Sequence, residues 1–295
     1  MPEIIRSYVP LTNSYPDVKQ INDCITSISN VIGKLKTDLK EGTWDNKDYA
    51  HYDLTLMPSM VRAANHKYPD MNLTFVKSVE ELVDLISEAK ANNQNAGRYI
   101  INMGEDGVHF AVVDCRIIDG KTSVMLFEPS RFSGQGPIFL ALRVKSELDN
   151  HLQDSTFFMV EMNLQGSKSE CGIYSLSIAK KLHVEKEQLD ALHVKNLSGE
   201  LSEGCEFIPC KTLDEFLPIK LYKHVQGTHR LEAYIQNNPE AETCIVNKKN
   251  ETLRDRFYNN TLLVGGHPKS ISIYNKRITE YETIKTRLLN SLRNY

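Results

Sequence analysis

Four side chains capable of nucleophilic catalysis occur in this chain in the order histidine, glutamate, glutamine, cysteine. The cysteine, Cys171, lies in the stretch QGSKSECGIYS, directly before a run that is typical of a helix. A thiol at a helix start faces unpaired backbone N–H groups and the positive end of the helix dipole, which favour the thiolate. Gln165 could turn its amide toward an oxyanion, and Gly172 allows close approach of another group. The stretch therefore predicts a candidate nucleophile.

A predicted hairpin brings the histidine and the glutamate together. The segment HFAVVDCRIIDGKTSVMLFEPS has Asp119 and Gly120 at its centre, a pair typical of a two-residue turn. If this turn sets the register, Ala111 faces Glu128, and His109 becomes a diagonal neighbour of Glu128 at a Cβ separation of about 7–8 Å or less. A carboxylate there orients the imidazole and stabilises its protonated form, which favours a cysteine–histidine–glutamate triad.

Each of these residues also has a structural explanation when it is considered alone. A single cysteine before a helix is more often a small buried hydrophobic residue than a nucleophile. His109 can be a strand residue with a satisfied hydrogen bond, Glu128 a carboxylate at the rim of the sheet and Gln165 a solvated loop residue. Only their combination makes an enzyme about as well supported as a purely structural role.

The elements that must position these residues are typical of an α+β fold. Apolar residues recur at helical spacing over 16–41, with Gly42 as a stop, and Ser78 with Glu81 forms a capping box for a second helix. Runs rich in β-branched and aromatic residues predict strands at 73–76, 98–103, 109–118 and 122–128. The patterns that follow predict a helix at 137–152, a strand at 155–164 and a helix after Cys171.

The C-terminal third differs from the rest of the chain in charge. Between Lys220 and Tyr295, 13 lysines and arginines stand against 7 acidic residues, although the whole chain has a net charge of −3. This asymmetry predicts a polyanion site rather than a nucleic-acid-binding surface. The elements after residue 200 are expected to be short. We predict three parts: 1–50 with the long first helix, which packs with the C-terminal region; a catalytic domain at 51–205; and a basic regulatory region at 206–295.

The composition excludes several classes of protein. With 41% hydrophobic and 25% charged residues, the 295-residue chain has the make-up of a soluble globular protein. No apolar run approaches the roughly 18 residues of a membrane span, and the N-terminus lacks the features of a secretory signal peptide. The sparse cysteines favour reduced thiols and a cytosolic setting, and no second ligand pair joins Cys205 and Cys210 to predict a metal site.

The longer segments around these residues carry a resemblance to a known family. The order of the four side chains resembles that of the ubiquitin-like-protease class of cysteine peptidases. The segments HFAVVDCRIIDGKTSVMLFEP, MVEMNLQGSKSECGIYSLSIAKKL, YKHVQGTHRLEAY, VNKKNETLRDRF and KRITEY are similar to the YopJ family of bacterial type III effectors, in its animal-pathogen branch. The similarity covers roughly residues 50 to 285. It implies a clan CE protease-type core, with an added helical and basic regulatory region, that is used as an acetyltransferase.

The resemblance also implies a mechanism and a setting. Acetyl-CoA would load Cys171 as a thioester, with His109 as base, Glu128 as its orienting group and Gln165 as an oxyanion donor. The acetyl group would pass to Ser, Thr or Lys side chains of host MAP kinase kinases and block their signalling, after type III secretion into the host cell cytoplasm. Inositol hexakisphosphate from the host would activate the enzyme.

Two ligand sites follow from the same resemblance. Ser167, Lys168 and Lys269, together with His109, would contact CoA. The residues implied to hold inositol hexakisphosphate or the phosphates of CoA are Lys180, Lys181, Lys223, His224, Arg230, Lys248, Lys249, Arg256 and Arg277.

Two other functions remain open at this stage. An isopeptidase acting on ubiquitin or a similar modifier could use the same triad to pass its acyl group to water. A non-catalytic effector that only binds kinases is the second alternative. The basic segments YKHVQGTHR and VNKKNETLRDR favour the transferase, because a protease has no need of a polyphosphate activator.

Overall fold

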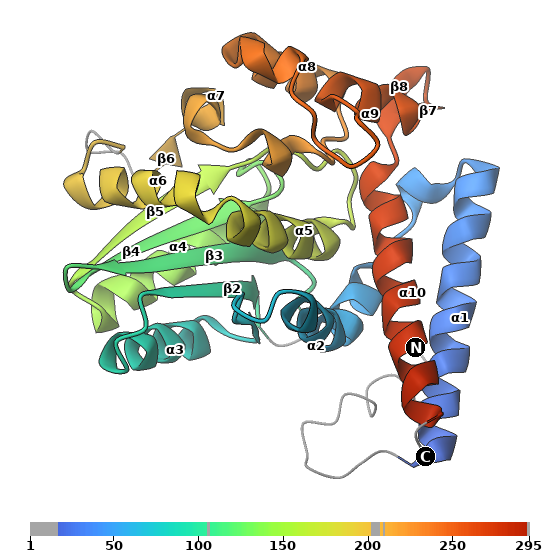
Figure 1. The fold of residues 1–295 in the computed structure, drawn as a ribbon, viewed down its shortest axis with the longest axis horizontal. Coiled ribbons are helices and arrows are strands. Elements are labelled where there is room, and N and C mark those ends of the chain that lie inside the picture. Colours follow the sequence, from blue (N-terminus) through green and yellow to red (C-terminus); the bar gives the residue numbers. More distant parts are fainter. Residues whose placement is uncertain (1–16, 105–106, 202–206, 209, 294–295) are drawn as a thin grey trace.

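A mixed β-sheet covered by helices on both faces forms the centre of the molecule (Figure 1). The computed structural model describes residues 17–104, 107–201, 207–208 and 210–293. Within these ranges the main sheet has the order β1-β2-β3-β4-β5-β6, and only the pairs β2–β3 and β3–β4 are antiparallel. The strands are β1 (Leu73–Val76), β2 (Ala96–Asn102), β3 (Phe110–Ile118), β4 (Lys121–Glu128), β5 (Ser155–Glu161) and β6 (Phe207–Ile208).

The hairpin of β3 and β4 has the predicted register. Asp119 and Gly120 both have positive φ angles, 50° and 77°, as a two-residue turn matched to strand twist requires. Val112 pairs with Phe127, which places Ala111 opposite Glu128. Because side chains alternate across the sheet, β3 and β4 both contribute to two apolar cores.

Helices divide between the two faces of the sheet. One core lies under α3 (Val79–Ala91) and α4 (Gln135–His151). The other core contains residues of α2 (Ala50–Lys67), α5 (Cys171–Val184) and α6 (Lys186–Ser198), and Figure 1 shows α5 and α6 on the opposite side of the sheet from α3. The nucleophile candidate is thus the first residue of a helix that is buried along most of its length.

A pair of long helices flanks this unit. The first helix, α1 (Val18–Glu41), is capped by Gly42 at a φ of 70°, and it lies along the last helix, α10 (Ser272–Leu292) (Figure 1). The expectation of only short elements after residue 200 is therefore wrong, because α10 has 21 residues. Its apolar residues Ile273, Tyr281 and Ile284 belong to the same buried core as α1 and α5.

Short elements connect these parts. They are η2 (Trp44–Asn46), α7 (Cys210–Leu213), η3 (Asp214–Phe216), η4 (Ile219–Tyr222), α8 (Thr228–Asn237), η5 (Pro239–Glu242), α9 (Leu253–Asn259), β7 (Thr261–Val264) and β8 (His267–Ser270). The predicted domain boundary after residue 205 lies outside the described residues, so the division into domains stays a prediction. None of the helices that the structure describes has the length and hydropathy needed to cross a bilayer.

Candidate active site

The hairpin places the predicted histidine against the predicted glutamate. His109 stands immediately before β3 and Glu128 ends β4, and the distance between His109 Nε2 and Glu128 Oε2 is 2.8 Å. The Glu128 side chain is fully buried, and Ser130 donates to its Oε1 from the backbone N–H at 2.9 Å and from the hydroxyl at 2.6 Å. A carboxylate with this many donors is held in one orientation, so it can fix the ring of His109.

The thiol lies beside this pair. Cys171 is 4% exposed, and its Sγ donates to the backbone oxygen of Val108 at 3.2 Å, one residue before His109. It begins α5, whose N-terminus has no side-chain cap. The first-turn N–H groups of a helix have no carbonyl partner within the helix, so they supply donors close to the sulfur.

Electrostatics favour a charged imidazole next to the thiol. Burial disfavours the imidazolium, but the charge of Glu128 and a hydrogen bond with Cys171 outweigh burial and raise the pKa of His109 to about 10. The ring is therefore protonated at neutral pH, and its positive charge lies beside the sulfur of Cys171. This arrangement can form and resolve a thioester.

The loop before the nucleophile is ordered by its own hydrogen bonds. Gln165 Nε2 donates to the backbone oxygen of Ser167 at 2.7 Å, and the backbone N–H of Gln165 donates to Pro129. A side-chain amide has two hydrogens, so the second hydrogen can still serve an oxyanion. The close approach predicted at Gly172 is made within the protein, because a Cβ there would lie 2.9 Å from the Cβ of Asp53 on α2.

A basic cavity of about 420 Å³ lies behind α5. Its walls come from α2, α5, α10 and the segment that contains Lys223 and His224. The basic residues that line the cavity are His66, Lys67, Lys180, Lys181, Lys223, His224, Lys276 and Arg287. Within the cavity wall, Glu280 accepts from Lys180 at 2.7 Å and from Lys276 at 2.6 Å.

The pKa values show that the positive charge in this cavity is poorly compensated. Burial, followed by the charges of Lys181, Arg256 and Lys276, lowers the pKa of Lys223 to about 8. Burial and the charges of Arg256 and Lys276 also hold the pKa of His224 well below its usual value. A polyanion would restore favourable charge interactions here, so the cavity has the character of a phosphate-binding site.

Comparison with known proteins identifies the family of this chain. A family model described as YopJ Serine/Threonine acetyltransferase matches residues 28–283. The chain belongs to the YopJ family. It is 46% identical over 258 residues to the serine/threonine-protein acetyltransferase YopJ of Yersinia pestis, a match that covers 87% of this chain and 90% of that protein.

Two solved structures share the fold of this chain. A structure described as AvrA delL154 with IP6 and CoA is 43% identical and superposes with a TM-score of 0.84 over 88% of this chain and 98% of that one. HopZ1a in complex with IP6 and CoA is 17% identical and has a TM-score of 0.70, over 90% of this chain and 98% of that chain, a likeness that shows the fold alone. These findings confirm the predicted family and the α+β fold.

The CoA contacts implied for this YopJ-family chain gather around the nucleophile loop. The hydroxyl of Ser167 contacts the carboxylate of Glu170, and Lys168 is exposed. Lys269 forms an ion pair with Asp45, and its side chain lies close to Gly166, in the same loop as Ser167. Their role toward CoA stays a prediction, and their positions are compatible with it.

Two of the implied phosphate contacts need correction. Arg230 is 4% exposed and Arg277 is fully buried, and each guanidinium is ion-paired with a buried aspartate. Arg230 Nη1 donates to Asp214 at 2.7 Å, and Arg277 Nη2 donates to Asp53 at 2.9 Å. A side chain enclosed in this way does not meet a dissolved polyphosphate, so both arginines serve the interior of the protein.

The other implied phosphate contacts divide into three groups. Lys180, Lys181, Lys223 and His224 line the basic cavity. Arg256 stands next to it and donates to the backbone oxygen of Lys223 at 3.1 Å. Lys248 and Lys249 are exposed and are absent from the cavity wall.

Part of the cavity and a buried network of hydrogen-bonded side chains were not predicted from the sequence. His66 and Lys67 end α2, a helix that was not predicted, whereas Lys276 and Arg287 recur at helical spacing along α10 and could have been found from that pattern.

This buried network has the arrangement of a serine–histidine–aspartate triad. Ser123 Oγ lies 2.8 Å from His193 Nδ1, and His193 Nε2 lies 2.9 Å from Asp114 Oδ2. None of the three side chains has any exposed surface, so no substrate reaches them and this hydrogen-bonded network has a structural role.

Proposed function

We propose that this protein is a secreted effector that transfers acetyl from acetyl-CoA, through a thioester on Cys171, to Ser, Thr or Lys side chains of host MAP kinase kinases. Delivery through a type III secretion system into the host cytoplasm is part of this proposal. The observation that carries it is the buried Glu128 held 2.8 Å from His109, beside Cys171, in a chain of the YopJ serine/threonine acetyltransferase family.

The first half-reaction uses the charged form of the pair. The Cys171 thiolate attacks the carbonyl carbon of acetyl-CoA, and the new carbon–sulfur bond forms as the bond to the CoA sulfur breaks. His109, protonated at neutral pH because its pKa is about 10, gives its proton to the departing CoA thiolate. The N–H groups at the start of α5 and the amide of Gln165 stabilise the oxyanion.

The second half-reaction uses the neutral ring. Once Cys171 is acetylated its negative charge is gone, and one of the interactions that raise the pKa of His109 disappears with it. The neutral imidazole takes the proton from the acceptor hydroxyl as the oxygen attacks the thioester, and Glu128 stabilises the imidazolium that results. Cys171 leaves as the thiolate when the thioester breaks, and the proton stays on His109, which regenerates the charged pair of the resting enzyme.

The basic cavity is the proposed site for inositol hexakisphosphate. AvrA and HopZ1a were solved with IP6, and the cavity here combines a half-buried Lys223 of lowered pKa with cations from three helices. The cations that we assign to the phosphates are Lys67, Lys180, Lys181, Lys223, Lys276 and Arg287. Ser167, Lys168 and Lys269 are assigned to CoA.

Acetylation of a purified MAP kinase kinase tests the function. The kinase, acetyl-CoA and this protein are incubated with and without inositol hexakisphosphate, and the products are read by intact-mass spectrometry. Cys171→Ala removes the proposed nucleophile, and Cys244→Ala is the matched cysteine control outside the site. The proposal predicts acetyl increments on the kinase that require both Cys171 and the polyphosphate. Trapping of a ubiquitin-type probe on Cys171, with no acetyl transfer, would instead show a protease.

A further inference from the structure

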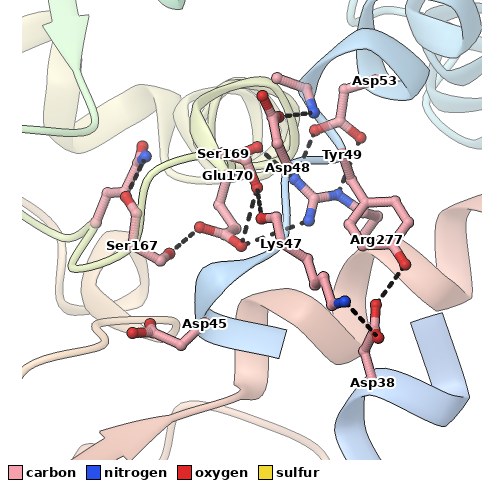
Figure 2. A network of polar contacts seen from close by, with 12 residues as sticks. Asp38, Asp45, Lys47, Asp48, Tyr49, Asp53, Ser167, Ser169, Glu170 and Arg277 are labelled. Carbon is pink, nitrogen blue, oxygen red and sulfur yellow. Dashed lines mark hydrogen bonds and ion pairs between the residues drawn. The ribbon is translucent and has the colours of Figure 1, made fainter. Parts of the chain in front are cut away.

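A buried guanidinium from the last helix holds the turn that leads into the nucleophile (Figure 2). Arg277 Nη2 donates to the backbone oxygen of Ser169 at 2.6 Å, and Arg277 Nη1 lies 3.5 Å from Glu170 Oε1. The same guanidinium binds both carboxylate oxygens of Asp53, at 3.1 and 2.9 Å. Ser169 and Glu170 are the two residues before Cys171, so α10 fixes the backbone on which the sulfur stands.

Other hydrogen bonds hold the same turn and the Asp53 carboxylate in place. The hydroxyl of Ser169 donates to the backbone oxygen of Lys47 at 3.1 Å, and Tyr281 donates to Asp53 Oδ1 at 2.7 Å. Asp53 packs so closely against Gly172 that a Cβ at that glycine would collide with it. The first turn of α5 is thus held between α2 and α10. Arg277 on α10 contacts both Asp53 on α2 and the backbone of Ser169.

The charge of Arg277 also matters for the thiolate. Two buried carboxylates, Asp53 and Glu170, lie beside the start of α5, and Arg277 pairs with both. Burial raises the pKa of Glu170, the charge of Arg277 lowers it and the charge of Asp53 raises it again. Arg277 therefore offsets the negative charge of two carboxylates that lie beside the start of α5.

The neighbouring residue on α10 faces the basic cavity. Lys276 lines that cavity and binds Glu280, whereas Arg277 reaches the nucleophile turn. We propose that Arg277 is a positioning residue for Cys171, and that α10 connects the polyphosphate cavity to the nucleophile through these two consecutive side chains. The connection to the cavity rests on the proposed function, whereas the positioning of Cys171 does not.

The reaction of Cys171 with iodoacetamide, followed by intact mass, tests the positioning without any acetyl transfer. In Arg277→Lys the charge remains, but an ammonium cannot reproduce the planar set of bonds to Asp53 and Ser169. Arg98→Lys is the matched control, because Arg98 is 4% exposed and pairs with the buried Asp114 on the sheet. Melting curves of all variants establish that they are folded, and calorimetry measures the binding of inositol hexakisphosphate.

We expect Arg277→Lys to be alkylated at least about tenfold more slowly than the wild type, because a misplacement of about 1 Å at a reacting centre can cost about 100-fold. Its kcat for acetyl transfer should fall further than its KM for acetyl-CoA changes, and its affinity for inositol hexakisphosphate should stay within about twofold of wild type. Alkylation of a folded Arg277→Lys at the wild-type rate, or equal slowing in Arg98→Lys, would overturn the inference.

Two further measurements separate the role of Arg277 from a folding defect and from the proposed function. Tyr281→Phe removes only one hydrogen bond to Asp53 and serves if Arg277→Lys does not fold. In Tyr281→Phe the alkylation of Cys171 should be slower than in the wild type, by a smaller factor than expected for Arg277→Lys. An unchanged alkylation rate would overturn the positioning role. A wild-type protein that transfers no acetyl refutes the proposed function, whereas the alkylation rates still decide the role of Arg277. The connection through α10 also predicts that inositol hexakisphosphate changes the alkylation rate of wild-type Cys171 and that Arg277→Lys loses most of this change. An equal change in both proteins would refute the connection.

Discussion

Replacement of Glu128 by glutamine should change how stability depends on pH. In the wild type, the pKa of His109 is raised from 6.5 to about 10 in the folded state, chiefly by the charge of Glu128 acting against burial. A raised pKa stabilises the fold fully below about pH 6.5, and this contribution is lost as pH rises toward 10. The slope is about 1.4 kcal/mol per pH unit, so between pH 7 and 9 the wild type should lose up to about 3 kcal/mol from this group. Glu128→Gln keeps the shape of the side chain and removes the charge, so that loss should disappear.

Urea unfolding at pH 7 and pH 9 measures this difference. The free energy gap between wild type and Glu128→Gln should shrink by about 2–3 kcal/mol from pH 7 to pH 9. Glu161→Gln is the matched control, because Glu161 pairs with Glu128 in the register of β4 and β5 and accepts from the backbone N–H of Phe132. Wild-type and Glu128→Gln profiles that run parallel would refute the charge assignment of the pair. Acetyl transfer by Glu128→Gln should fall on the order of 1,000-fold, as expected when the orienting carboxylate of a triad is lost.

Three further outcomes follow from the structure. Lys223→Met should weaken binding of inositol hexakisphosphate about 10- to 100-fold, whereas Lys248→Met should change the affinity little. Binding to the wild type should weaken as the pH rises through 8, and in this range binding should be accompanied by proton uptake. Calorimetry in two buffers measures both the affinity and the proton uptake. His193→Ala should lower the free energy of unfolding by about 3 kcal/mol, because it leaves the buried carboxylate of Asp114 without one of its partners. The alkylation rate of Cys171 should stay unchanged, because His193 makes its hydrogen bonds outside the candidate active site. Gly172→Ala should cost about 1–3 kcal/mol in urea unfolding and slow alkylation, and wild-type values for both would contradict the packing against Asp53.

The contact between His109 and Glu128 was predictable because it depends on local rules. The Asp119–Gly120 turn fixes the hairpin register, and register alone sets which side chains share a face. The position of Cys171 at a helix start was visible from the periodicity that follows it. These signals lie within about 20 residues of each other or within one element. The approach of Cys171 to His109 is different, because it is a tertiary contact between α5 and the segment before β3.

The parts that escaped prediction depend on contacts between distant segments. Basic residues such as Arg230 and Arg277 carry no mark in the sequence that separates a buried ion pair from a phosphate ligand, because burial of the pair is set by tertiary packing. The helix α2 has Pro58 in its interior, which masked its helical pattern. Lys67 therefore had no predicted place in the cavity.

The central claim is that Cys171 carries the acetyl group between the two half-reactions. The most direct measurement is intact-mass and peptide mass spectrometry of the protein mixed with acetyl-CoA and inositol hexakisphosphate, quenched in acid within seconds and without any kinase. We expect a single hydroxylamine-sensitive acetyl group on Cys171, absent from Cys171→Ala, that disappears when a MAP kinase kinase is added. An acetylated kinase formed at the normal rate by Cys171→Ala would contradict the account, because transfer would then proceed without the thioester.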